Sequence, residues 1–149
     1  MSSRTVGHMG VAAAKPRPVP DDFSATYWAG AREHRLVIRR CQVCQTFQHP
    51  PAAFCRNCGS EALVPEELSG KGVVRSFVVL EETPVPGFQA ETPFTVAAVE
   101  LVEQPDLVLC ANVIGPGRDN IEIGALTTMA WEELPDGTVL PQISLEGAN

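Results

Sequence analysis

Two Cys-x-x-Cys pairs, Cys41 with Cys44 and Cys55 with Cys58, constrain this chain more than any other feature. Each pair bends the backbone so that two sulfurs point at one ion, and four thiolates complete the tetrahedral shell of a structural zinc. Because protein ligands take all four positions, none remains for water or substrate. We therefore expect one structural Zn²⁺ per chain. Iron in the same cage is the alternative, since four thiolates suit both metals.

The apolar segments and the cysteines predict the cellular compartment and the environment of the fifth cysteine. The sequence contains no run of roughly 20 apolar residues and no continuous apolar secretory signal, which predicts a cytoplasmic protein without membrane contact. A reducing cytosol favours metal binding over disulfides for the paired cysteines. Cys110 lies in an apolar run and is expected to be a small buried side chain, not a nucleophile.

Composition shifts divide the chain into four expected parts. They are a mobile tail at 1–20, an N-terminal helix at 21–34, a zinc ribbon at 35–68 and an OB-fold domain at 69–149. The helix is expected to start at Asp21 or Asp22, either of which can cap free N–H groups. Its aromatic residues Phe23, Tyr27 and Trp28 are expected to form the hydrophobic centre of a partner interface, or else to pack on the barrel.

The C-terminal part has five short β-rich runs separated by Pro- and Gly-containing turns. They are Val73 to Leu80, Phe94 to Val102, Leu107 to Ile114, Ala125 to Leu134 and Val139 to Leu145. Five short strands with no crossover helix predict a small antiparallel barrel, because closure removes exposed edges. Pro141 inside the last run predicts that this strand is an edge strand or begins there.

Charge is divided unevenly along the chain. Ten Lys and Arg against six Asp and Glu through Arg75 give +4, and one against twelve from Ser76 onward gives −11, which sum to −7. An acidic β-domain repels a phosphate backbone, so we do not expect nucleic acid to bind it. The sequence also lacks a Ser-His-Asp or Cys-His pattern, paired catalytic carboxylates and a phosphate-binding glycine loop. We expect no enzyme activity from the chain alone.

An ordered set of short motifs carries a family resemblance from about Phe23 to Leu145. The set comprises Tyr27-Trp28-Ala29-Gly30, Phe47 with Pro50-Pro51, Cys55-x-x-Cys58-Gly59-Ser60, Ser69-Gly70-Lys71-Gly72-Val73-Val74 with Ser76-Phe77, Thr92-Pro93-Phe94, Val99-Glu100-Leu101, Asn112-Val113-Ile114-Gly115, Ile123-Gly124 and Glu132-Glu133-Leu134-Pro135-Asp136-Gly137. The chain thereby resembles the zinc-ribbon plus OB-fold proteins of the DUF35 type, which are associated with acyl-CoA enzymes. The resemblance implies a mainly β fold: an N-terminal helix, a rubredoxin-like zinc ribbon and a C-terminal five-stranded OB-fold barrel.

The resemblance also implies a function. Such proteins are non-catalytic partners of thiolase-superfamily enzymes or lipid-transfer-protein aldolases, with acyl-CoA at a shared site. The implied chemistry is retro-aldol cleavage of steroid or other side-chain acyl-CoA, or thiolysis. Where relatives often have Pro after the third cysteine, this chain has Arg56.

Candidate contacts to CoA phosphates follow from the basic stretch before Ser76. They are Arg56, Lys71 and Arg75, because CoA presents phosphates to such groups. His49, on the expected hairpin between the cysteine pairs, is a further candidate ligand contact. Two other functions stay open: a nucleic-acid-binding ribbon and OB module that would use the same basic stretch, and a rubredoxin-like electron carrier that would need iron.

Overall fold

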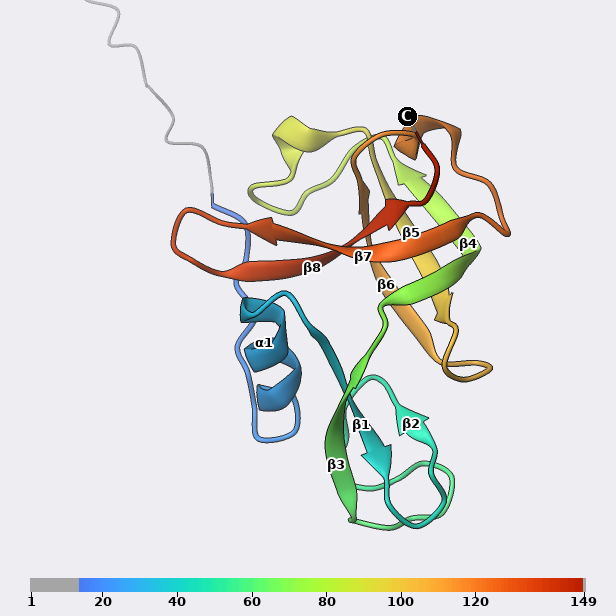
Figure 1. Ribbon diagram of the computed structural model, residues 1–149. Coiled ribbons are helices and arrows are strands. Elements are labelled where there is room, and N and C mark those ends of the chain that lie inside the picture. Colours follow the sequence, from blue (N-terminus) through green and yellow to red (C-terminus); the bar gives the residue numbers. More distant parts are fainter. Residues whose placement is uncertain (1–13, 149) are drawn as a thin grey trace, which may run out of the picture.

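The structure is a computed structural model that describes residues 14–148. It has one short helix, a three-stranded ribbon and a five-stranded barrel, with the ribbon projecting from one end of the barrel (Figure 1). This arrangement confirms the expected mainly β fold with a helix, a zinc ribbon and an OB-like barrel. No helix in the described residues is long and apolar enough to cross a bilayer.

Helix α1 spans Ala25–Arg32 and is shorter than the predicted segment at both ends. Asp21 still organises its start, because its Oδ1 accepts hydrogen bonds from the backbone N–H groups of Phe23 and Ser24 at 3.1 and 2.7 Å. The helix packs against the first ribbon strand and the last barrel strand, so it joins the two sheets.

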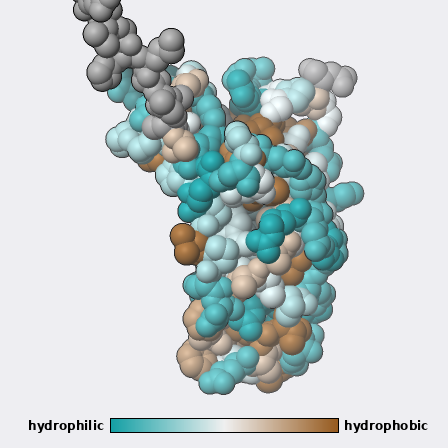
Figure 2. All heavy atoms as spheres, turned by 90° about the vertical axis from the view of Figure 1, so that its left-hand side faces the viewer, coloured by the Kyte–Doolittle hydropathy of each residue, from teal (hydrophilic) through white to brown (hydrophobic). Residues whose placement is uncertain are grey.

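The aromatic residues of the helical segment divide between core and surface. Tyr27 packs against the core, and burial raises its pKa to about 12. Trp28 contacts Tyr27 edge to face at 5.1 Å and is half-buried, while Phe23 is exposed. Figure 2 shows the face that carries α1, on which hydrophobic residues are scattered among hydrophilic ones. A partner interface through Phe23 and Trp28 therefore stays a prediction.

The ribbon is a three-stranded antiparallel sheet in the order β2-β1-β3. Its strands are β1 (Leu36–Cys41), β2 (Phe47–Gln48) and β3 (Leu63–Leu68). Strand β1 has the β-branched content that predicted it, and it ends at the first cysteine of the cluster.

The barrel closes in the order β4-β5-β6-β8-β7. Its strands are β4 (Lys71–Leu80), β5 (Phe94–Leu101), β6 (Val108–Ile114), β7 (Leu126–Glu133) and β8 (Val139–Leu145), with the short 3-10 helices η1 (Gln89–Glu91) and η2 (Arg118–Asn120) in two connections. Closure depends on β4 pairing with β7, and on β6 running parallel to β8 at Val113 and Ile143. All five predicted strands are present within a few residues of their expected bounds.

The prediction for Pro141 was wrong. It lies inside β8, opposite Trp131 of β7, and β8 is not an edge strand. Proline is tolerated there because β6, the other neighbour, pairs with β8 only from Ile143 onward. The missing N–H therefore costs no ladder hydrogen bond on that side.

One apolar core runs from the barrel into the near end of the ribbon. Buried ribbon residues Leu36, Ile38, Phe47 and Leu68 belong to the same cluster as the barrel interior. That interior consists mainly of Val74, Ala97, Val99, Leu101, Leu107, Leu109, Val113, Ile121 and Ile143. The far end of the ribbon has a separate small cluster, made of Cys41, Cys55 and Leu63.

The segment before α1 lies against the barrel over the residues that the structure describes. Lys15 is buried, and its Nζ lies 2.6 Å from carboxylate oxygens of both Glu91 and Glu132. Arg17 pairs with Asp136 in the turn between β7 and β8. The predicted mobile tail also covers residues 1–13, which lie outside the described part of the chain.

Candidate functional site

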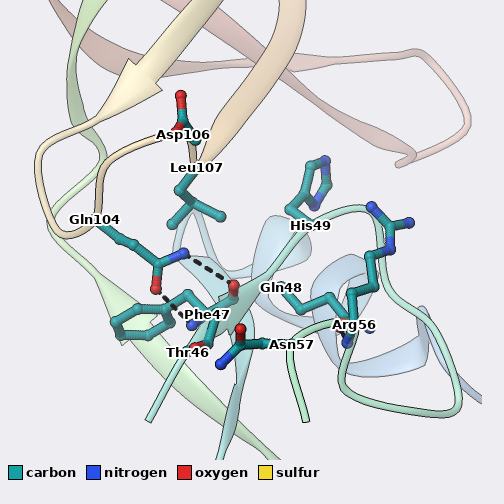
Figure 3. Close-up of a pocket in the computed structure, with 9 residues that line it drawn as sticks. All are labelled: Thr46, Phe47, Gln48, His49, Arg56, Asn57, Gln104, Asp106 and Leu107. Carbon is teal, nitrogen blue, oxygen red and sulfur yellow. Dashed lines mark hydrogen bonds between the residues drawn. The ribbon is translucent and has the colours of Figure 1, made fainter. Parts of the chain in front are cut away.

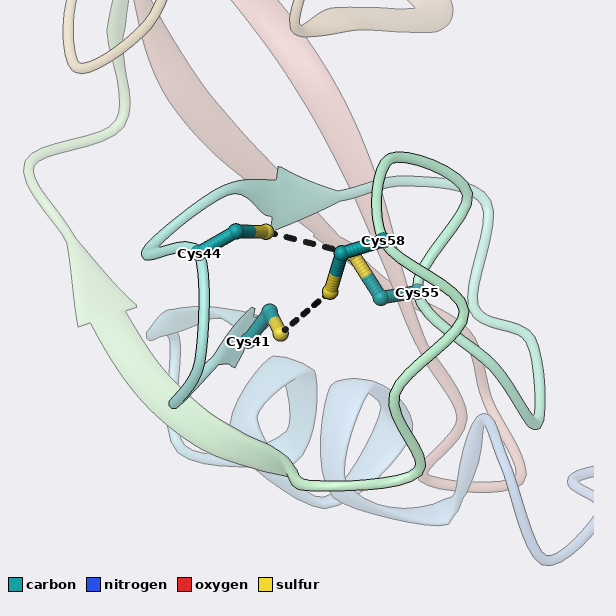
Figure 4. Close-up of side chains that lie close together, drawn as sticks. All are labelled: Cys41, Cys44, Cys55 and Cys58. Atoms are coloured by element: carbon teal, nitrogen blue, oxygen red, sulfur yellow. Dashed lines mark hydrogen bonds between the residues drawn. The ribbon is translucent and has the colours of Figure 1, made fainter.

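The four-cysteine cluster lies at the end of the ribbon farthest from the barrel (Figure 4). Its four sulfurs lie within 4.8 Å of one another, with Cys41 and Cys58 at 3.6 Å and Cys44 and Cys55 at 3.5 Å. Sulfurs at the corners of a tetrahedron with Zn–S bonds of about 2.3 Å lie about 3.8 Å apart. The donor set and its spacing therefore fit one tetrahedral metal ion.

Two knuckles with the same backbone pattern hold these cysteines. In each, the first cysteine's C=O accepts from the N–H four residues on, which belongs to Gln45 in one knuckle (2.9 Å) and Gly59 in the other (2.8 Å). Both of these residues have positive φ, at 64° and 75°. The sequence indicated this turn at Gly59 but not at Gln45, because glycine is the residue that adopts positive φ without strain.

The surroundings of the cluster favour the thiolate, the form that binds metal, at Cys44, whereas burial and the neighbouring cysteines raise the pKa of Cys58 to about 12. Hydrogen bonds from Asn57 and Thr46 lower the pKa of Cys44 to about 5. Cys110 lies outside the cluster, and the expectation that it is buried was wrong. On β6, Leu109 and Val113 take the inner face, so Cys110 points outward and is exposed.

A cleft of about 290 Å³ adjoins the cluster, at the junction of ribbon and barrel (Figure 3). Its lining combines the β2 region, the second knuckle and the turn before β6: Thr46, Phe47, Gln48, His49, Arg56, Asn57, Gln104, Asp106 and Leu107. Two glutamine side chains, which the sequence analysis did not single out, hydrogen-bond the segments that line the cleft. Glutamine is common on protein surfaces, and no local sequence pattern predicts these long-range hydrogen bonds.

Gln104 ties the ribbon to the barrel. Its Oε1 accepts from the backbone N–H of Phe47 at 2.8 Å, and its Nε2 donates to the C=O of the same residue at 3.2 Å. Gln48 ties β2 to the second knuckle, because its Oε1 accepts from the N–H of Arg56 at 2.7 Å and its Nε2 donates to the C=O of Phe54 at 2.8 Å. These four hydrogen bonds from two side-chain amides therefore fix the relative positions of the segments that line the cleft.

His49 and Arg56 lie on the same side of the cleft (Figure 3). The His49 ring lies 5.3 Å from the Tyr27 ring, and its buried Nδ1 has no hydrogen-bond partner among the described residues. Burial, and secondarily the positive charge of Arg56, lower the pKa of His49. The Arg56 guanidinium, which lines the cleft, suits a ligand with acceptor atoms, such as a phosphate.

The three predicted CoA contacts are not gathered in one place. Arg56 lines the cleft, and no carboxylate of the described residues pairs with it. Arg75 does not line the cleft; it pairs with Asp106, which does, at 2.8 Å and with Glu100 at 2.9 Å. Lys71, at the start of β4, is exposed and is not part of the cleft lining. Their contact with CoA stays a prediction.

The rest of the basic stretch is partly neutralised within the chain. Arg35 pairs with Glu33 and Glu67, and Arg40 pairs with Glu66. A groove that tracks a nucleic-acid backbone needs free cations along its length. The ion pairs therefore weaken the alternative of a nucleic-acid-binding module.

Two family models match consecutive parts of the chain. Residues 28–64 match the model described as "ChsH2, rubredoxin-like zinc ribbon domain", and residues 65–132 match "ChsH2, C-terminal OB-fold domain". The first match begins within α1 and ends at the start of β3, and the second begins within β3, ends in β7 and leaves out β8.

Similar proteins include two curated hydratase subunits. A probable enoyl-CoA hydratase alpha subunit of Thermomonospora curvata is 40% identical over 129 residues, which cover 87% of this chain and 39% of that protein. The 3-oxo-4,17-pregnadiene-20-carboxyl-CoA hydratase alpha subunit of Mycobacterium tuberculosis is 29% identical over 137 residues, covering 83% and 42%. The chain thus spans about two fifths of the length of these relatives.

A solved structure described as "Ltp2-ChsH2(DUF35) aldolase" matches with a TM-score of 0.76 and 37% identity, covering 87% of this chain and 98% of that one. This match extends over nearly the whole of the related chain, so ribbon and barrel correspond together. The chain belongs to the ChsH2/DUF35 family of zinc-ribbon plus OB-fold proteins.

Proposed function

We propose that the chain is a non-catalytic subunit that docks on a thiolase-superfamily enzyme and helps form its acyl-CoA site. The observation that carries the proposal is the 37% identity to a chain of the Ltp2-ChsH2(DUF35) aldolase, over 98% of that chain. The reaction we assign to the assembly is C–C bond cleavage of a steroid or other side-chain acyl-CoA by retro-aldol chemistry, with thiolysis as the alternative.

The metal we assign to the cluster is a single structural Zn²⁺. Its four thiolate ligands would leave no coordination position for substrate, so it would not act as a Lewis acid. The metal would instead hold the two knuckles together. Since Gln48 joins the second knuckle to β2, the metal would also keep Arg56 at the cleft.

The ribbon–barrel cleft is the place where this chain would meet CoA. Arg56 offers a free guanidinium on one side of it, and the His49 ring lines the cleft beside Arg56 although its unpaired Nδ1 is itself buried. A charged, bidentate donor next to a neutral imidazole suits a phosphate group, which has acceptor oxygens. The partner subunit would supply the reacting groups and the rest of the substrate site.

A hydratase assembly is the second candidate, and the identity to hydratase alpha subunits favours it. In those relatives the matching region is only about two fifths of the chain. In such an assembly this chain would serve an acyl-CoA hydratase component instead of an aldolase.

The test is purification of the tagged chain from its own host, followed by mass spectrometry of the proteins that accompany it. We expect a thiolase-like subunit in a simple stoichiometric ratio. An acyl-CoA hydratase component in that position would favour the second candidate. Recovery of the chain with no acyl-CoA enzyme at near-stoichiometric level would contradict both.

The cleft is tested in the resulting complex by Arg56→Ala. We expect KM for the acyl-CoA to rise roughly three- to tenfold, because a charge-assisted contact to phosphate is lost. Arg32→Ala is the matched control, since Arg32 is exposed, has no carboxylate partner in the described residues and lies outside the cleft. Equal KM values for the two variants would contradict the proposal that CoA binds in this cleft.

A further inference from the structure

The outward face of β4, β5 and β6 differs from an ordinary solvent-facing sheet surface. Alternate residues of these strands point away from the core, as the burial of Thr95, Ala97 and Val99 on the inner face shows. The strand register places the outward residues in two rows across the sheet: Val78, Val96 and Asn112, then Ser76, Ala98 and Cys110. We call these six residues the outer face.

None of the six residues of the outer face carries a charge. Antiparallel sheets with one solvated face usually alternate apolar inside with polar outside. Here Val78 is 55% exposed, and half-buried Leu80 and Phe94 continue the apolar row at one end. The first outward charge on β5 is Glu100, and Arg75 already pairs with it at 2.9 Å.

The β4–β5 connection lies against one corner of this face, where Phe88 contacts Phe94 at 5.7 Å and Asn112 lines a pocket with Ala90 and Glu91. Away from that corner, Ser76, Val78 and Cys110 are exposed. Helix α1 packs against β1 and β8, and Figure 1 shows it on the side of the molecule away from β4 and β5. The centre of the face is made of small side chains, Ser76, Ala98 and Cys110, flanked by larger ones. Larger side chains of another protein could therefore pack closely against the strands.

The charge of the chain argues against a second copy as the occupant. Residues from Ser76 onward carry one base against twelve acids, which gives −11, so two copies would repel each other across this face. Exposed Glu81 and Glu82 border the end of β4, where they suit basic residues on another protein. A relative that matches over 98% of its length is described in an aldolase together with a second protein.

We propose that the outer face of β4, β5 and β6 is the surface that docks on the thiolase-like partner subunit. The complementary surface is an uncharged apolar patch with basic residues at the rim that faces Glu81 and Glu82. This inference rests on the proposed function, because it names the surface through which that assembly forms. The cleft with Arg56 lies elsewhere on the molecule and is not part of this face.

A matched pair of substitutions tests the surface in binding assays with the purified, zinc-loaded chain and the partner subunit identified by co-purification. Val78→Glu places a charge on the outer face, and Val64→Glu places the same charge on β3 of the ribbon. Both valines lie on strands and are exposed, at 55% and 40%. We expect Val78→Glu to weaken the dissociation constant at least about tenfold and Val64→Glu to change it less than about twofold.

Labelling of Cys110 tests the same surface in the chain without substitutions. This measurement can be made even if Val78→Glu fails to fold. The other four cysteines would be bound to metal, so N-ethylmaleimide should modify the exposed Cys110 in the free chain. We expect its labelling rate to fall at least about tenfold in the complex. A Cys110→Ser chain shows how much labelling comes from other positions.

The outcomes separate the inference from the proposed function. A complex that forms while Cys110 stays equally reactive, or while Val78→Glu binds as well as Val64→Glu, would overturn the docking surface and leave the proposed function standing. If no thiolase-like subunit binds the chain at all, the proposed function fails and the docking surface fails with it. If the labelling rate of Cys110 falls when the concentration of the chain is raised without any partner, a second copy covers this face, and the inference is overturned.

Discussion

The far end of the ribbon and the barrel are stabilised in different ways. The barrel has a continuous apolar interior, in which Leu101, Leu109 and Ile143 are almost completely buried. The far end of the ribbon buries only Cys41, Cys55 and Leu63 together, with Cys44 beside them. Burial of so few side chains cannot offset the entropy of ordering both knuckles. We therefore expect metal coordination to take the place of a hydrophobic core there.

The ribbon itself contains both kinds of stabilisation. The barrel-facing residues Leu36, Ile38, Phe47 and Leu68 pack with the barrel core, although all of them precede the predicted domain boundary at residue 69. The predicted boundary between ribbon and barrel at residue 69 therefore does not separate the part stabilised by the apolar core from the part that depends on the cysteine cluster. We expect the knuckles to respond to metal, and the rest of the ribbon to follow the barrel.

Loss of one metal ligand should have the largest effect. Structural zinc contributes about 10 to 16 kcal/mol in finger-like peptides, so Cys41→Ser should abolish metal binding and unfold the knuckles. We expect about one zinc per wild-type chain by elemental analysis, and amide exchange that becomes fast in both knuckles while β5 and β6 stay protected. Cys110→Ser is the control and should keep its zinc. Soluble, folded wild-type protein with almost no metal would contradict this account, and iron in place of zinc would support the electron-carrier alternative.

Truncation of the clamp between the two regions should have an intermediate effect. Gln104→Ala removes both hydrogen bonds to the Phe47 backbone and leaves those partly buried groups unpaired, at a cost of about 1 to 3 kcal/mol. Urea unfolding should show this loss with zinc still bound. Gln89→Ala, on the exposed helix η1, should change stability by less than about 0.5 kcal/mol. Equal effects of the two variants would show that the clamp does not couple ribbon to barrel.

The smallest expected effect is the pH response of His49. Burial and then Arg56 lower its pKa, so the folded chain favours the neutral ring, and Tyr27 also faces it. The stability linked to this residue is fully present above the unfolded pKa of about 6.5 and is lost as pH falls toward the lower folded pKa. His49→Gln should therefore reduce the fall in Tm between pH 7.5 and 5. Loss of metal at low pH affects both proteins, and identical slopes would exclude His49 as a contributor.

The parts of this molecule that were predictable from sequence have local causes. The cysteine spacing specifies a metal cluster, and Pro- and Gly-rich turns delimit five strands, as in the segment Pro135-Asp136-Gly137 between β7 and β8. The parts that were missed depend on distant partners. Gln104 acts on a backbone group 57 positions away in sequence, and Pro141 is tolerated only because of where β6 begins to pair.

The orientation of Cys110 was missed for a related reason. An apolar run predicts a strand but does not say which alternate residues face the core, and a strand with apolar residues on both faces gives no preference. The same ambiguity hid the uncharged outer face of β4, β5 and β6. It became visible only when the register aligned Ser76, Ala98 and Cys110 across three strands.

The most direct test of the proposed partner role is a reconstitution of acyl-CoA cleavage from purified components. Turnover would be measured for the zinc-loaded chain alone, for the co-purifying thiolase-like subunit alone, and for the two mixed at equal concentration. We expect no turnover above background by the chain alone, and a rate for the mixture that is at least about tenfold above that of the thiolase-like subunit alone. Turnover by the isolated chain with contaminants excluded, or a mixture no faster than the subunit alone, would contradict the proposed partner role.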